Sequence, residues 1–271
     1  MLKLLHASLF RLRKSRLLWL CMAVTFAVSS AFARKMGGSG EITWKLDVAI
    51  LQVFPFLSIL YAAFLGLFLG AEYQDGTIRN KIVAGHTRSS VYLSQLGAAV
   101  LGCLGIMLAW AMSAPVGSIR LGWFTAPWRT LLLRLVVLLM TLGATSAILT
   151  LVAMLIPNRA VSSVAVILTA LALLLLSAYF YNALCEPETH PLGSLTENGF
   201  SIGEPAPNPN YIGGTLRTVY QFLTDTLPAG QAILLANEEL AKPALSLGAS
   251  LLITLLTAGA GILAFRRKDL K

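Results

Sequence analysis

The chain has 271 residues, of which 56% are apolar and 12% are charged, and its formal net charge is +9. Its mean hydropathy is +0.75. This composition excludes an ordinary soluble domain, because a water-facing surface needs more charged side chains. We expect the positive charge to set the orientation of the chain in a membrane and not to bind nucleic acid.

Six apolar runs are long enough to cross about 30 Å of hydrocarbon, which takes about 20 residues of helix. Backbone groups must pair within each run at that depth, so the runs are predicted to be helices. Strand-period alternation is absent, which argues against an outer-membrane barrel. Residues 1–271 are therefore predicted to form a single all-α polytopic membrane domain. The predicted crossings are Leu17–Ala33, Val48–Ala71, Val91–Met112, Leu131–Ile156, Val161–Phe180 and Ala244–Phe265.

The basic residues predict how these crossings are oriented. If the N-terminus is inside, 13 of the 21 lysines and arginines lie on the inner side of the membrane. Only three of the 12 acidic residues lie on that side. Short loops rich in lysine and arginine favour the cytoplasmic side. Both termini and residues 72–90 are therefore predicted to be cytoplasmic, and residues 181–243 to be extracellular.

Residues 1–16 have the pattern of a short amphipathic helix. The apolar face holds Leu2, Leu5, Leu9 and Leu12, and the opposite face holds Lys3, Arg11 and Lys14. This pattern predicts a helix that lies in the inner membrane interface before the first crossing. A secretory signal peptide is the competing interpretation, since Ala31-Phe32-Ala33 has the small-x-small form of a cleavage site.

Two crossings carry local signals. Pro55 is expected to kink the second crossing near its outer end, because proline lacks a backbone N–H. Gly66 and Gly70 in the same crossing have the small-xxx-small spacing that allows close helix packing. Trp123 and Trp128, before the fourth crossing, are expected to anchor it in the interface.

The polar segment Glu72–Ser90 lies between the second and third crossings. Asp75-Gly76-Thr77 supplies a turn with Thr77 as the expected N-cap, and Gly85 is placed to end a short helix. Ser89 or Ser90 is expected to cap the next helix. The short helix would carry an apolar stripe of Ile78, Ile82 and Val83, with Arg79, Asn80 and Lys81 facing elsewhere. Two interpretations stay open: a helix that transmits force between the crossings, and a basic loop that only sets topology.

Residues 181–243 are too long for a simple connection. Their first half is rich in proline, glycine, asparagine and glutamate and is predicted to be irregular. A helix is predicted from Thr215, with a break at Pro228-Ala229-Gly230 and a second short helix over Gln231–Leu240. The pair would lie on the outer membrane face or dip into it, either as a gate or as a lid without function. The stripe of the first helix holds Leu216, Val219, Tyr220, Leu223 and Leu227, with Arg217, Gln221 and Asp225 elsewhere.

The six runs contain no ionisable residue at depth, and Arg134 lies near the outer end of its run. Ion-coupled carriers and proton pumps usually need such residues. No phosphate-binding GxxxxGK[ST] motif occurs, so the chain is not expected to be an enzyme or to hold a cofactor or metal. The histidines outside the runs are expected to be solvated; these are His6, His86 and His190. Energy for uphill transport would have to come from another subunit.

The sequence resembles the permease subunit of bacterial ABC-2 type ATP-binding-cassette transporters. Three stretches, together with the six-crossing layout, extend this resemblance over nearly the whole chain. The family's basic connecting helix is similar to LLHASLFRLRKSRLLWL. The family's segment between crossings two and three is similar to EYQDGTIRNKIVAGHTRSSVYLSQ, the most specific of the three stretches. The outer helical segment before the last crossing is similar to GGTLRTVYQFLTDTLPAGQ.

The resemblance implies roles for two sets of residues. Thr77–Ala84 would be a coupling helix docked in a groove of a separate ATPase, and Thr215–Leu240 would form small outer helices above the exit of the pathway. The ATPase-coupling residues would be Glu72, Thr77, Ile78, Arg79, Lys81, Ile82, Val83 and Arg88, with the apolar ones in the groove and Arg79, Lys81 and Arg88 at its rim. The outer gate residues would be Leu216, Val219, Tyr220, Leu223, Asp225, Pro228 and Gln231.

The resemblance also implies the partners. Two permeases, identical or different, would meet around a two-fold or pseudo-two-fold axis in the bacterial cytoplasmic membrane. Each would bind one of two ATPase copies, which hold ATP and Mg²⁺ and supply the differential affinity between states. The expected substrate is amphipathic or hydrophobic, such as an antimicrobial peptide, a lipid-like compound or a drug. The alternatives are a secondary transporter or channel and a non-transporting sensor or scaffold.

Overall fold

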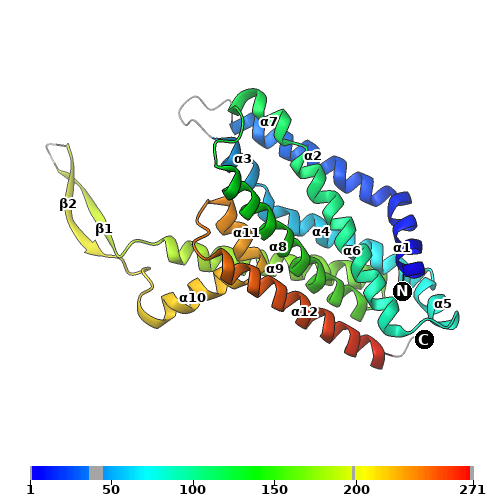
Figure 1. Cartoon of the computed structure of the whole chain (residues 1–271). Helices are drawn as coiled ribbons and strands as arrows, with labels where there is room; N and C mark the ends of the chain where they lie inside the picture. The colour runs from blue at the N-terminus through cyan, green and yellow to red at the C-terminus, as the bar shows by residue number, and fades with distance from the viewer. Residues whose placement is uncertain (1, 37–44, 197–198, 269–271) are drawn as a thin grey trace.

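Six helical segments of the described residues are long and apolar enough to cross a membrane. The computed structural model describes residues 2–36, 45–196 and 199–268 (Figure 1). The number of segments confirms the six crossings predicted from the apolar runs. Their bounds are Arg16–Met36, Leu46–Gln74, Arg88–Ile119, Trp128–Leu155, Arg159–Cys185 and Pro243–Arg267.

The described chain contains twelve α-helices, one short 3-10 helix (η1) and two strands, in the order that Figure 1 labels. The helices are α1 (Leu2–Lys14), α2 (Arg16–Met36), α3 (Leu46–Leu51), η1 (Phe54–Phe56), α4 (Leu57–Gln74), α5 (Thr77–Val83), α6 (Arg88–Ala111), α7 (Ala114–Leu121), α8 (Trp128–Leu155), α9 (Arg159–Cys185), α10 (Gly214–Thr226), α11 (Pro228–Ala236) and α12 (Pro243–Arg267). The strands are β1 (Thr189–Thr196) and β2 (Gly199–Pro207).

The second crossing is interrupted where the sequence predicts a kink. Pro55 lies in η1, between α3 and α4. A proline has no backbone N–H to donate, so the α-helix is interrupted there. The glycine prediction for this crossing is also confirmed. A Cβ atom on Gly66 would lie 2.7 Å from Ser163 Cα, and one on Gly70 would lie 3.1 Å from Arg159 Cα. Both glycines therefore let α4 pack closely on α9.

The third crossing continues past its predicted end. After Ser113 the chain forms α7, so the third candidate span reaches Ile119. The predicted anchors Trp123 and Trp128 are both exposed next to the start of α8. An exposed indole at the end of a span is typical of the membrane interface.

A β-hairpin replaces the irregular structure predicted for the first half of residues 181–243. β1 and β2 pair antiparallel, with an irregularity between Pro191 and Gly193. The hairpin projects from the end of the bundle opposite to α1 and α5 (Figure 1). Proline-rich sequence hides a strand pattern, but a two-stranded hairpin tolerates proline because each strand has one unpaired edge. The all-α prediction is therefore incomplete here.

The two predicted outer helices are present with different bounds for the second. α10 begins one residue before the predicted Thr215. α11 begins at Pro228, which the sequence analysis takes as part of a break, because proline is well suited to the first turn of a helix. All nine residues of α11 are buried, and the helix packs against η1, α8, α9 and α10. It is therefore inserted into the bundle.

Candidate functional site

The short helix α5 lies outside the six spans, at the end of the bundle where α1 also lies (Figure 1). Its C-terminus matches the prediction. Gly85 has a left-handed φ of 87°, its N–H donates to the Ile82 carbonyl at 2.9 Å, and the His86 N–H donates to the Lys81 carbonyl at 3.2 Å. This pair of hydrogen bonds is a Schellman motif, and glycine supplies its left-handed residue at least cost.

Two capping predictions are wrong. Gly76, with φ of 65°, is the N-cap of α5, and the Thr77 side chain does not cap the helix. Thr87 caps α6 by accepting a hydrogen bond from the Ser90 N–H at 3.3 Å, so neither Ser89 nor Ser90 is the cap. The hydroxyl of Thr77 is engaged elsewhere, at Glu72.

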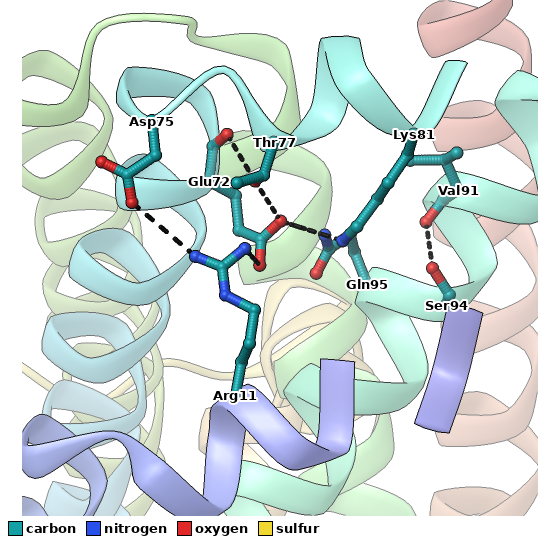
Figure 2. A network of polar contacts seen from close by, with 8 residues as sticks. All are labelled: Arg11, Glu72, Asp75, Thr77, Lys81, Val91, Ser94 and Gln95. Atoms are coloured by element: carbon teal, nitrogen blue, oxygen red, sulfur yellow. Dashed lines mark hydrogen bonds and ion pairs between the residues drawn. The ribbon is translucent and has the colours of Figure 1, made fainter. Parts of the chain in front are cut away.

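Glu72 lies at the centre of a buried polar cluster that joins four helices (Figure 2). Arg11 Nη1 lies 2.6 Å from its Oε1, and Lys81 Nζ lies 2.9 Å from its Oε2. Gln95 Nε2 and Thr77 Oγ1 donate to Oε2 at 2.9 and 2.7 Å. We call these five residues the Glu72 cluster. Since they come from α1, α4, α5 and α6, the cluster fixes α5 to the spans on both sides of it and to the N-terminal helix.

The charges balance when Asp75, which lies outside the Glu72 cluster, is counted with it. The Glu72 side chain is fully buried, and Lys81 is nearly so. Arg11 also lies 3.7 Å from the exposed carboxylate of Asp75, so two cations face two carboxylates (Figure 2). A buried charge that loses its partner costs about 3–5 kcal/mol, so removal of either partner should strongly destabilise the folded chain. Glu72 and Lys81, predicted to meet a partner protein, therefore meet each other inside this chain.

An apolar cluster covers the inner side of α5. Ile78 is 1% exposed, and Ile82 is partly buried beside it. The cluster brings together side chains from α1, α5, α6, α8 and α12, namely Leu4, Ile78, Val91, Tyr92, Met154 and Phe265. The predicted docking stripe is thus corrected: Ile78 packs within this chain, and Val83, which is 79% exposed, is the apolar residue that α5 presents to solvent.

The end of α12 is tied to the same region. Arg88, predicted at the rim of a partner's groove, instead donates to the carbonyl oxygens of Arg266, at 3.1 Å, and of Lys268. Such contacts satisfy helix C-terminal carbonyls that have no partner in the helix. Lys268 Nζ donates to Tyr73 Oη at 3.0 Å and to the Met154 carbonyl at 2.9 Å. Burial lowers the pKa of Lys268 to about 8.

The side of α5 that remains exposed is narrow. Arg79, Asn80, Val83 and Ala84 are exposed on it, and we call these four residues the outward face of α5. Of the eight predicted coupling residues, Arg79 and Val83 lie on this face. The outward face therefore offers one large apolar side chain beside one cation.

The predicted outer gate residues divide between two environments. The stripe of α10 faces outward, with Leu216 50% exposed and Val219 44% exposed, and Leu223 is half-buried. The buried residues of α10 are Thr224 and Asp225. Leu216 and Val219 therefore face away from the bundle, because α10 turns its polar side toward α11 and α12.

Three of the predicted gate residues lie on this polar side or next to it. Tyr220 packs its ring 4.7 Å from that of Phe180. Burial raises the pKa of Asp225, an effect that Lys242, 3.8 Å away, partly offsets. Pro228 is buried at the start of α11. These contacts fix the end of α10 against α9 and the start of α12.

Gln231 is the hydrogen-bonding centre of the outer region. Its Oε1 accepts from Thr141 at 2.9 Å and from Ser250 at 2.7 Å. Its Nε2 lies 3.0–3.2 Å from the carbonyl oxygens of Asp225, Thr226 and Ser246. The side chain is fully buried, so these bonds fix α11 to α8, α10 and α12.

Sequence reasoning missed the partners from distant segments. The amphipathic pattern of residues 1–16 places Arg11 on the face opposite the apolar one, and Gln95 lies within an apolar run. Asp47 was missed as well: it is 3% exposed, and its Oδ2 accepts hydrogen bonds from the backbone N–H groups of Thr125, at 3.0 Å, and Ala126, at 3.1 Å. The available signal was that Asp47 and Glu72 directly flank an apolar run, where an unpaired carboxylate is costly.

The side chains around α5 join it to neighbouring helices. Within the described residues, histidine, cysteine, aspartate and glutamate form no group of three that could hold a metal ion. The carboxylate of Glu72 is engaged by four donors, which leaves it unsuited to take up a proton from a substrate. No protein-family model matches the chain, and no curated protein sequence matches it.

Proposed function

We propose that this chain is the membrane-spanning permease subunit of an ATP-driven exporter of the ABC-2 type. The observation that carries the proposal is α5, a short helix between the second and third spans that is held rigidly by buried side chains and keeps one face exposed. The six spans and the resemblance of three sequence stretches support the same proposal.

The connections of α5 favour force transmission over a topology-setting loop. The Glu72 cluster joins α5 to α1, α4 and α6, and the apolar cluster around Ile78 joins it to α8 and α12. A loop that only sets topology needs exposed cations, whereas this segment buries a carboxylate and a cation at considerable cost. Pressure on the outward face of α5 would therefore reach the ends of five helices.

The proposed partner at this face is a separate ATPase subunit. Val83 would be the anchor in its groove and Arg79 would lie at the rim, since a few buried residues carry most of the energy of such interfaces. ATP and Mg²⁺ would be held by the two ATPase copies, and a second permease subunit would complete the pathway. The complex would lie in the bacterial cytoplasmic membrane, with both termini of this chain inside.

The proposed substrate is amphipathic or hydrophobic. Among the buried carboxylates of the described spans, Asp47 and Glu72 lie at opposite ends of one span and are held by several donors each. This placement supports energy supply by ATP better than coupling to an ion gradient, which needs ionisable groups along the pathway. An antimicrobial peptide, a lipid-like compound or a drug would fit an apolar interior.

Co-purification tests the proposal. The tagged chain, isolated in mild detergent from membranes of the organism that carries it, should co-elute with Mg²⁺-dependent ATP hydrolysis, and reconstituted vesicles should move substrate when ATP is supplied. Transport driven by an ion gradient without ATP would instead support a secondary transporter. A chain that elutes without ATP hydrolysis and moves no substrate under either condition would support a sensor or scaffold.

A further inference from the structure

The side of α1 that is turned away from the bundle is basic and aromatic. Lys3, Phe10, Arg13 and Lys14 are exposed there, and we call these four residues the outer face of α1. On the opposite side, Leu4, Ser8 and Leu12 are buried where α1 packs against α6. Figure 1 shows α1 turned sharply from the direction of α2, across the end of the bundle.

The cations of this face are not neutralised by the chain itself. Residues 1–16 contain five lysines and arginines and no acidic residue. Arg11 points inward and pairs with Glu72. The other cations of α1 have no carboxylate within 4.0 Å among the described residues. A fixed cluster of positive charge therefore faces outward.

Apolar side chains continue from this face onto the first span. The Lys14 ammonium lies 4.5 Å from the centre of the Phe10 ring. The Trp19 indole N–H donates to the Arg13 carbonyl at 3.0 Å, and Trp19 and Leu20 are both more than half exposed on α2. Cations beside exposed aromatic rings at the start of a span are typical of a helix in the headgroup layer.

We propose that the outer face of α1 binds the headgroups of anionic phospholipids in the adjoining leaflet. Lys3, Arg13 and Lys14 would contact the phosphates, and Phe10 would enter the acyl boundary. The bilayer is favoured over an acidic soluble protein because the apolar surface of Phe10 continues into the exposed residues of a membrane-spanning helix. Anionic lipid attracts each nearby lysine or arginine, and several together give selectivity.

The inner side of α1 prepares this face for binding. Arg11 anchors the helix to Glu72 at 2.6 Å, and Leu4 lies in the apolar cluster under α5. The outer cations are therefore presented at fixed positions before any lipid binds, which lowers the entropy cost of binding. The inference does not depend on the proposed transport function.

Titration of the purified full chain in neutral detergent tests the inference. Short-chain phosphatidylglycerol should raise the thermal unfolding temperature at lower concentration than short-chain phosphatidylcholine. In the triple variant Lys3→Gln, Arg13→Gln, Lys14→Gln, the phosphatidylglycerol concentration for half of the effect should rise at least about tenfold, since each cation contributes roughly fivefold.

A matched control removes the same charge elsewhere. Arg34, Lys35 and Lys45 are exposed at the far end of the first span and the start of α3, and their triple replacement by glutamine should keep the preference. Loss of the preference in both triple variants would show a net-charge effect and overturn the proposal. An unchanged preference in the α1 variant would overturn it too. Equal stabilisation by glycerol phosphate, which has no acyl chains, would show a free-anion site and would also contradict it.

Discussion

The Arg11 guanidinium lies 2.6 Å from the Glu72 carboxylate, which joins the first helix of the chain to the end of its second span. The same carboxylate accepts hydrogen bonds from Thr77 at the start of α5 and from Gln95 in α6. Helices that meet at one buried charge cannot separate without exposing it unpaired. This relationship is why we treat α5 as part of the rigid bundle and not as a loop.

Glu72→Gln should destabilise the chain by about 3 kcal/mol. The change keeps the shape of the side chain but leaves Arg11 and Lys81 facing a neutral amide. The cost lies at the lower end of that for a broken buried pair, because Arg11 is 36% exposed and can turn toward water. The free energy of unfolding in detergent, from chemical denaturation, measures it.

Asp75→Asn is the matched control for that change. Asp75 lies 3.7 Å from Arg11 and is mostly exposed, so the loss should stay below about 1 kcal/mol. Equal effects of the two substitutions would mean that the Glu72 cluster behaves as an ordinary surface network.

Ile78→Ala should lower the stability of the chain strongly, and Val83→Ala should leave it almost unchanged. Ile78 is fully buried, and its truncation should cost about 2–5 kcal/mol of stability. Val83 is exposed, so its truncation should change stability by less than about 0.5 kcal/mol. Unfolding curves of both variants decide the point. Similar losses at both positions would contradict the assignment of inner and outward sides of α5.

Gln231→Glu should destabilise the outer region by about 3 kcal/mol or more. The second carboxylate oxygen would face the three backbone carbonyl oxygens that Nε2 now contacts, with no proton to donate. Gln221→Glu, on the exposed side of α10, makes the same chemical change and should be nearly neutral. Should Gln231→Glu unfold like the parent chain, α11 is not fixed by this side chain.

Lys268→Met should change the pH dependence of stability. Burial lowers the pKa of Lys268 to about 8 in the folded chain, from 10.5. Between these values the unfolded chain holds the proton and the folded chain has released it, so the Lys268 contribution to stability increases as pH rises. The parent should gain stability relative to Lys268→Met from pH 8 toward 10.5, in thermal unfolding scans. Parallel pH profiles for the two chains would contradict this.

The features that depend on local sequence were predictable. The six spans follow from apolar length, because hydrocarbon imposes helices wherever a run can cross it. The end of α5 follows from Gly85, since a left-handed residue after a short helix is usually glycine. The interruption at Pro55 and the close helix packing at Gly66 also follow from the residue type at a single position.

The side that α5 buries was not predictable in the same way. At 100° per residue, Val83 lies about 140° around the helix from Ile78, so the three-residue stripe was too wide to face one groove. Which part of it is buried depends on Leu4, Tyr92 and Phe265, which come from three other helices. Periodicity identifies an apolar side but not the segment that covers it.

The other features that the sequence did not predict depend on residues distant in sequence. A single arginine among the cations of α1 turns inward, and no local pattern distinguishes Arg11 from Arg13. The side that α10 buries depends on distant segments in the same way, because the Asp225 carbonyl accepts hydrogen bonds from Gln231 on α11 and Ser246 on α12. Buried polar groups are satisfied by whichever segment the fold brings near.

The central claim is that the outward face of α5 receives force from a separate ATPase, and Val83→Asp tests it most directly. The side chain is exposed, so the variant should unfold at the temperature of the parent chain. A carboxylate in the apolar groove of the partner should weaken association at least about tenfold. Ile119→Asp is the control, since Ile119 is 83% exposed on α7, at the opposite end of the bundle.

The measurement is the Mg²⁺-dependent ATP hydrolysis that co-purifies with each variant, per mole of this chain. We predict that the parent and Ile119→Asp retain equal activity and that Val83→Asp retains about a tenth of it or less, at unchanged thermal stability. Full activity in Val83→Asp would contradict the account, because the one large apolar side chain on the outward face of α5 would then play no part in binding an ATPase.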